Sequence, residues 1–174
     1  GRWWILALVS ASASQVLITI FWSDAKVGTL ANVLVVLVAI VGLGQWRFSA
    51  VVTSELAEPH AHAGAPRSLI KMSDLGHMPA PIRRWLIHAG VVGQVPARVV
   101  RLHQRGTMQV SPNGRWMPFV AKQWVAIQAP AFVWVVEVDA YPGVFLAGRD
   151  TYRNERGAMR IEALSVLPVA NARG

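Results

Sequence analysis

The stretch from Trp3 to Trp22 reads WWILALVSASASQVLITIFW and contains no charged residue. At about 1.5 Å per residue, a helix of this length spans roughly 30 Å, the thickness of the hydrocarbon core of a bilayer. Tryptophans at both ends are typical of the aromatic belt at a membrane surface. The small residues between Ser10 and Ser14 permit close approach of a second helix, and Gln15 requires a polar partner there. We therefore predict a transmembrane helix over residues 3–22.

A second apolar run, TLANVLVVLVAIVGLGQW, covers residues 29–46 and follows a short polar turn. The first run taken alone also fits a cleaved signal peptide. A second run of nearly full spanning length, directly after the turn, favours a transmembrane helical hairpin over residues 1–47, with helices over about 3–22 and 29–46.

The orientation of the hairpin depends on few charges. Arg2 and Arg47 flank its open end, whereas Lys26 lies in its turn. The positive-inside rule counts Lys and Arg, so the balance leans towards a cytoplasmic domain. We expect an integral protein of the cell membrane whose first partner is the lipid bilayer.

The chain contains no cysteine, which excludes disulfides, thiolate catalysis and cysteine-ligated metal sites. Its formal net charge is +8 and its pI is about 11.3. Basic domains bind nucleic acid or anionic lipid more readily than acidic ones, although scattered arginines also simply keep strand surfaces soluble. No nucleic-acid recognition motif accompanies the charge, so we expect no nucleic-acid partner.

Residues 48–78 are rich in Ala, Ser, Glu, Pro, Gly and His and show little periodicity, which predicts a linker. His60 and His62 lie within it. Two ligands in a mobile loop make a poor metal site, because structural and catalytic sites need three or four. We expect neither a metal nor a cofactor.

Residues 79–174 form the predicted domain. Pro79 opens a short helix that Gly90 ends, with Ile82, Trp85 and Leu86 on one apolar face. Beyond Gly93 the hydrophobic period changes to two, which indicates half-buried antiparallel strands. Turn signals such as SPNG and YPG separate them. We predict five strands, over about residues 100–110, 115–128, 132–139, 144–153 and 158–167.

Consecutive strands joined by short turns form an antiparallel meander. The predicted fold class is therefore α+β: an N-terminal transmembrane helical hairpin, then a short helix and a curved antiparallel sheet with helical cover.

Several spaced blocks carry a family resemblance: LGHMPAPIRRWLIHAGVVGQ, RVVRLHQRGTMQ, GRWMPFVAKQWVAIQAPAFVW and GRDTYRNERGAMRIEALSVLPVANARG, with WSDAKVGTLANVL in the hairpin. In these blocks the chain resembles a family of uncharacterised bacterial membrane-anchored proteins that is known only as a domain of unknown function. The resemblance covers most of the chain and implies no activity. By pattern, the sheet also resembles the curved half-barrels of periplasmic lipoprotein-carrier proteins.

The ends of the chain predict a fragment. Gly1 stands where an initiator Met would stand, and Gly174 directly follows a strand-like stretch. Members of the family usually continue past the point where this chain stops, so the resemblance also implies a fragment. We expect both ends to be missing.

Pro118 and eight further positions match the family's characteristic blocks. The eight are the candidates for a ligand site: Trp116, Phe119, Gln123, Phe132, Trp134, Arg149, Asp150 and Tyr152. Aromatic rings on a curved sheet line an apolar cavity well, and they are equally good core. Neighbours in a strand point to opposite faces. An inward-facing Arg149 or Asp150 therefore orients a ligand or performs acid–base work, or it braces the sheet through an ion pair with a neighbouring strand.

Three functions remain open. The first is a membrane-tethered, non-enzymatic module that binds a lipid or other apolar ligand on a curved sheet. The second is a structural or interaction module of the bacterial envelope with no ligand. The third is a hydrolase-like enzyme that uses Asp150 together with His103. A sizeable apolar cavity separates the first from the second, and a cleft that joins Asp150 to His103 favours the third.

Overall fold

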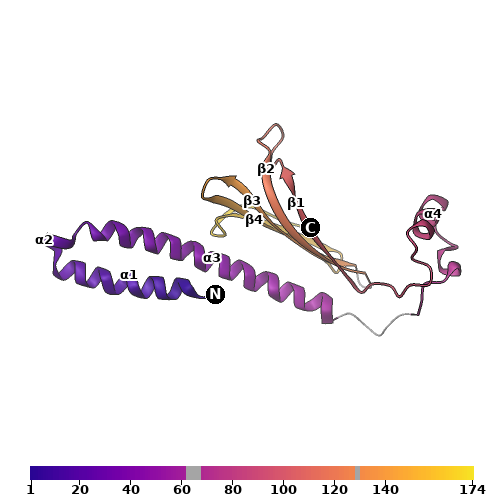
Figure 1. The fold of residues 1–174 in the computed structure, drawn as a ribbon, viewed down its shortest axis with the longest axis horizontal. Helices are drawn as coiled ribbons and strands as arrows, with labels where there is room; N and C mark the ends of the chain where they lie inside the picture. The colour runs from indigo at the N-terminus through magenta and orange to yellow at the C-terminus, as the bar shows by residue number, and fades with distance from the viewer. Residues whose placement is uncertain (62–67, 128–129) are drawn as a thin grey trace.

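The computed structural model describes residues 1–61, 68–127 and 130–174, with the backbone alone for residues 58–61. A helical hairpin leads into a six-stranded sheet, and a short helical segment lies beyond the far end of the sheet (Figure 1). The elements are α1 (Trp3–Ile20), α2 (Trp22–Ala25), α3 (Gly28–Ala61), the 3-10 helix η1 (Met72–Leu75), α4 (Ala80–His88), β1 (Val99–Met108), β2 (Met117–Ala126), β3 (Ala131–Tyr141), β4 (Val144–Arg153), β5 (Arg156–Ala163) and β6 (Leu167–Arg173).

The hairpin is held by small residues and one polar cluster. Ala11 of α1 and Ala39 of α3 are buried where the two helices pack. The Gln15 side chain donates from Nε2 to Oγ1 of Thr29 at 3.2 Å and accepts at Oε1 from Nδ2 of Asn32 at 3.0 Å. The prediction that Gln15 needs a polar partner on the second helix is confirmed.

Both long helices are long and apolar enough to cross a membrane. In the most apolar stretch of each, 11% of the α1 residues and 17% of the α3 residues are buried within the molecule. A core helix of a soluble protein would bury most of its apolar side chains, whereas Leu6, Leu17 and Leu34 are more than half exposed here.

Helix α3 is much longer than the sequence predicted. Its 34 residues correspond to about 50 Å at the usual rise. The prediction of a helix ending near residue 46 and of a linker from residue 48 is therefore wrong in that region, because residues 48–61 continue α3. Between Trp46 and Leu56 the chain contains no Gly or Pro, so nothing interrupts the helix after the apolar run ends.

The sheet is an antiparallel meander with strand order β1-β2-β3-β4-β5-β6, as predicted. It has six strands rather than five. The predicted fifth strand divides at Leu164 and Ser165, whose φ angles are 55° and 57°. Two successive residues in the left-handed region reverse the chain, although neither is the glycine or asparagine that usually marks such a conformation in a sequence.

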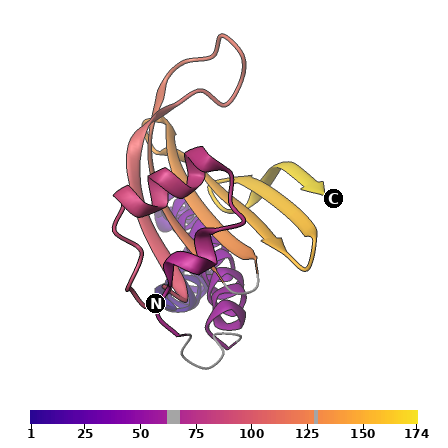
Figure 2. The same cartoon turned by 90° about the vertical axis from the view of Figure 1, so that its right-hand side faces the viewer.

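Helix α3 lies against one face of this sheet, which we call the inner face; the opposite face is the outer face (Figure 1). In the view of Figure 2 the strands pass α3 with β1 and β6 at opposite edges. The turn between β5 and β6 meets α3 at Gly44, where an added Cβ would lie 2.4 Å from the carbonyl oxygen of Ser165. The close approach of helix and sheet therefore depends on this glycine.

The expected helical cover comes from α3 and not from α4. Figure 1 shows α4 beyond the end of the sheet, and Ile82 and Trp85 of its apolar stripe are 50% and 66% exposed. The apolar core of the sheet lies on the outer face, where the buried residues are Met117, Ala121, Val136, Val138 and Ala140.

Candidate functional site

Most of the candidate ligand-site residues share the outer face. Gln123, Trp134 and Asp150 are direct partners in register across β2, β3 and β4. Phe132 and Tyr152 are partners two residues further along, on the same face, and their rings stack with centroids 6.2 Å apart. Phe119 packs beside Trp134 against the buried core of this face. Six of the eight candidates therefore lie together.

Trp134 is fixed by a residue that the sequence reasoning missed. Its indole Nε1 donates a hydrogen bond to Oε1 of Gln104 on β1, at 2.7 Å. Gln104 is an isolated polar residue among the positions of β1 that point to the apolar face. This isolation is the feature of the sequence that could have identified it. The bond satisfies the only polar atom of the indole, and the ring presents its apolar surface.

Arg149 and Trp116 lie elsewhere. Nε of Arg149 is 3.3 Å from Oε2 of Glu55 in α3, and both side chains are largely buried. This ion pair joins the sheet to a helix, whereas the sequence suggested that Arg149 or Asp150 could form an ion pair across two strands. Trp116 precedes β2 and is 63% exposed, so it does not contribute to the row on the outer face.

The structure does not bring Asp150 and His103 together in one cleft, as the hydrolase-like function would require. Asp150 shares its register row with Trp134 on the outer face, whereas His103 is the direct partner of Lys122 on the inner face. The sheet separates the two side chains. Glu137 and Asp139, two carboxylates at alternate positions of β3, are exposed on the inner face.

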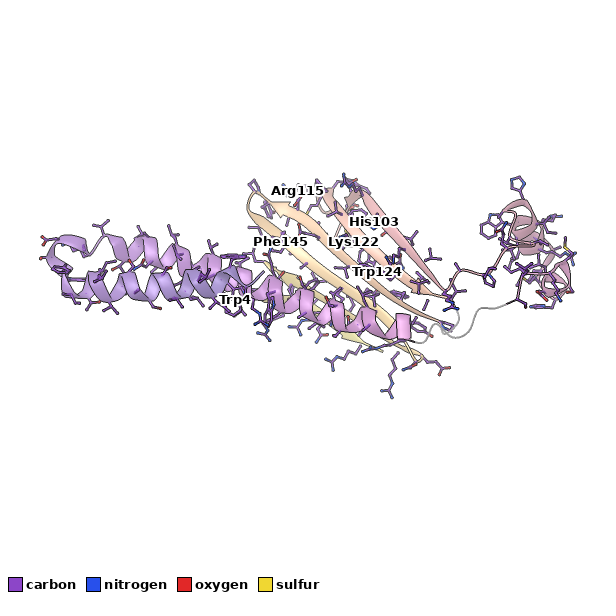
Figure 3. The ribbon with its side chains drawn as sticks, turned by 60° about the horizontal axis from the view of Figure 1, so that its bottom comes forward. Trp4, His103, Arg115, Lys122, Trp124 and Phe145 are labelled. Atoms are coloured by element: carbon purple, nitrogen blue, oxygen red, sulfur yellow. The ribbon has the colours of Figure 1, made fainter. Side chains whose placement is uncertain are left out.

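A cleft of about 850 Å³ lies between the open end of the hairpin and the inner face. Trp3, Gln45 and Phe48 line it from the helices, and His103 and Lys122 line it from β1 and β2. Figure 3 shows His103 and Lys122 on neighbouring strands, above α3 and beyond Trp4. The sequence reasoning missed this cleft, because it depends on the continuation of α3 beneath the sheet.

No group of three or more His, Asp or Glu side chains that could hold a metal ion occurs in the part of the chain that the structure describes. His62 lies outside the described residues, and so does the side chain of His60.

The chemistry of the two faces differs. The outer face presents aromatic and aliphatic side chains with a few polar groups at Gln104, Gln123 and Asp150, a composition typical of sites for apolar ligands. The inner face presents cations beside α3, a composition suited to anions.

Comparison with known proteins places the sheet within a described family. Residues 68–174 match the model of a family of unknown function (DUF6544). The predicted resemblance to a family of unknown function is thereby confirmed for the domain. No curated protein and no solved structure matches the chain. The expected likeness to lipoprotein-carrier half-barrels is therefore not supported by a matching structure.

Proposed function

Because the chain belongs to DUF6544, a family from which no activity can be transferred, we propose from its own geometry that it is a membrane-tethered, non-enzymatic module that holds a lipid or other apolar ligand on the outer face of its sheet.

The observation that carries the proposal is the apolar row on the outer face. Leu102, Trp134 and Met159 occupy one register row, in which they alternate with Gln123 and Asp150, and Leu102 is 40% and Met159 38% exposed. Large apolar side chains that remain exposed on one face, with a few polar groups between them, are a common mark of a binding surface. Figure 1 shows the described helices beside or beyond this sheet, with α3 on the inner face only.

The occupant that fits this surface is a lipid chain. The hairpin presents exposed apolar side chains on both long helices, which suits insertion in a bilayer. Helix α3 continues without interruption from the apolar run to the sheet, so membrane lipid is the most concentrated apolar molecule beside it. Arg2 and Arg47 at the open end favour the cytoplasmic side.

Native mass spectrometry of the full chain, released from membranes in mild detergent, tests this proposal. We expect a co-purifying lipid that is largely lost in Trp134→Gln and Tyr152→Gln. Trp116→Gln is the matched control, since Trp116 is exposed and lies off the outer face, and it should retain the ligand. Circular dichroism of each variant checks that the sheet remains folded.

A second candidate is an interaction module without a ligand. It is favoured by the burial of Ala121, Val136 and Val138, which shows that side chains of the outer face already pack on one another. A folded parent chain that carries no lipid, with both outer-face variants indistinguishable from Trp116→Gln, would reject the ligand proposal and favour this alternative.

A further inference from the structure

Five arginines line one pocket of about 730 Å³ on the inner face. They come from β4, β5 and β6 and are Arg149, Arg153, Arg156, Arg160 and Arg173. Among the lining side chains that the structure describes, only that of Glu55 carries a carboxylate. The pocket is therefore strongly positive, and it lies on the opposite side of the sheet from the apolar row.

The strand register concentrates this charge. Arg149 lies directly opposite Arg160, and Arg153 lies directly opposite Arg156, so the β4–β5 ladder contains two arginine pairs. Like charges in such positions repel and destabilise a sheet. Carboxylates offset the repulsion within the first pair. Oε2 of Glu55 lies 3.3 Å from Nε of Arg149, and Oε1 of Glu162 lies 2.5 Å from Nε of Arg160.

Arg156 and Arg173 have no such compensation. Ala158, the partner of Arg173, lies two residues from Arg156, so the two arginines are diagonal neighbours on one face. Both are exposed, and neither side chain forms a hydrogen bond or ion pair with the residues that the structure describes. Their guanidinium groups remain available to a ligand.

We propose that this arginine pocket binds a phosphate-bearing ligand. Guanidinium groups present paired N–H donors that match the oxygens of a phosphate, and several converging arginines suit a group with more than one negative charge. The pocket holds such a group and would relieve the repulsion between its own cations. The inference goes beyond the apolar ligand of the outer face and does not depend on it.

The phosphate has two potential sources, a soluble phosphorylated molecule and a lipid headgroup. A smaller pocket of about 270 Å³ shares Arg149 and Arg160 with the arginine pocket and extends to Gly44 and Arg47 at the open end of the hairpin. A headgroup at the surface of a bilayer would reach the arginines by this route.

The test uses the full chain in nanodiscs of phosphatidylcholine, titrated with inorganic pyrophosphate and followed by isothermal calorimetry at constant ionic strength. We expect saturable binding that weakens roughly tenfold or more in the double variant Arg156→Gln, Arg173→Gln, because two charge-assisted contacts are lost. Arg83→Gln, Arg84→Gln on α4 removes the same charge far from the pocket and should bind as the parent does.

Three results would overturn the proposal: no binding by the folded parent chain, an equal loss in the α4 control, or tighter binding of a poly-glutamate peptide than of pyrophosphate, which would indicate an acidic protein partner. Nanodiscs containing phosphatidic acid then separate the two sources. Competition with pyrophosphate supports a headgroup ligand, and undiminished pyrophosphate binding supports a soluble one. Lipid retention by Trp134 variants is a separate readout, so failure of either proposal is recognisable.

Discussion

Gln15 shows how one residue determines the pairing of two helices. It is the most polar side chain of the first apolar run, and it reaches both Thr29 and Asn32 of α3. In a setting with little water, an amide without partners is costly, and bonds between helices specify which faces meet.

We expect Gln15→Leu to weaken association of α1 with α3 by about 1 kcal/mol, since both hydrogen bonds are lost and two polar partners remain unsatisfied. Reversible unfolding in mixed micelles measures the change. Thr19→Val is the control, because the Thr19 hydroxyl bonds the carbonyl of Gln15 within its own helix. Equal stability of the two variants would contradict this role for Gln15.

At the same scale, the sequence identified most residues of the outer face but not their anchors. Strand periodicity predicted that Phe132 and Trp134 share a face of their strand, because alternation is local. The register between β3 and β4 brings Asp150 to the same face. Gln104 and Glu55 were not identified from the sequence, because each interacts with a residue distant along the chain. Gln104 bonds Trp134, and Glu55 pairs with Arg149. Such pairings follow from the register and from the docking of α3.

The most consequential element is α3, because it links the hairpin to the sheet as one helix. Its apolar part pairs with α1, and its remaining turns lie along the inner face and bear Glu55. A continuous helix sets the orientation of the sheet relative to the hairpin, which a linker over residues 48–78 would not do.

We expect Ala50→Pro to loosen this orientation. Ala50 is exposed, so the change removes little packing, but proline within a helix costs about 3 kcal/mol or more and kinks it. Spin labels on cysteines introduced at Lys26 and Glu155, in a chain without native cysteine, should give a broad distance distribution in Ala50→Pro. Ala50→Ser should keep the narrow distribution of the parent; an equally narrow distribution in the proline variant would refute a rigid α3.

At the scale of the whole molecule, the division between an apolar hairpin and a basic sheet is the basis for proposing that the protein lies in and against a membrane. The exposed apolar side chains of both long helices would have to leave water, and a bilayer provides that environment. The sheet would then lie directly at the membrane surface, because its β5–β6 turn touches α3 at Gly44, near the end of the apolar run.

We expect Val38→Arg to impair membrane insertion of the full chain, because an arginine near the centre of a spanning helix costs about 2.5–3.5 kcal/mol. Val38 is 58% exposed, so its replacement disturbs no core. Resistance to alkaline extraction from membranes measures the effect, with Val38→Leu as control. Complete alkaline extraction of both Val38→Leu and the parent would show that the hairpin does not span a bilayer.

The sequence by itself determined the features that depend on neighbouring residues: two apolar helices, a short helix from Pro79, and an antiparallel meander read from the two-residue period and its turns. Only the tertiary structure decided the continuation of α3 beneath the sheet, the left-handed turn at Leu164 and Ser165, and the separation of Asp150 from His103. Periodicity reports which side chains share a face. Which face meets a helix, and which cations then gather in one pocket, depends on contacts between segments far apart in the chain.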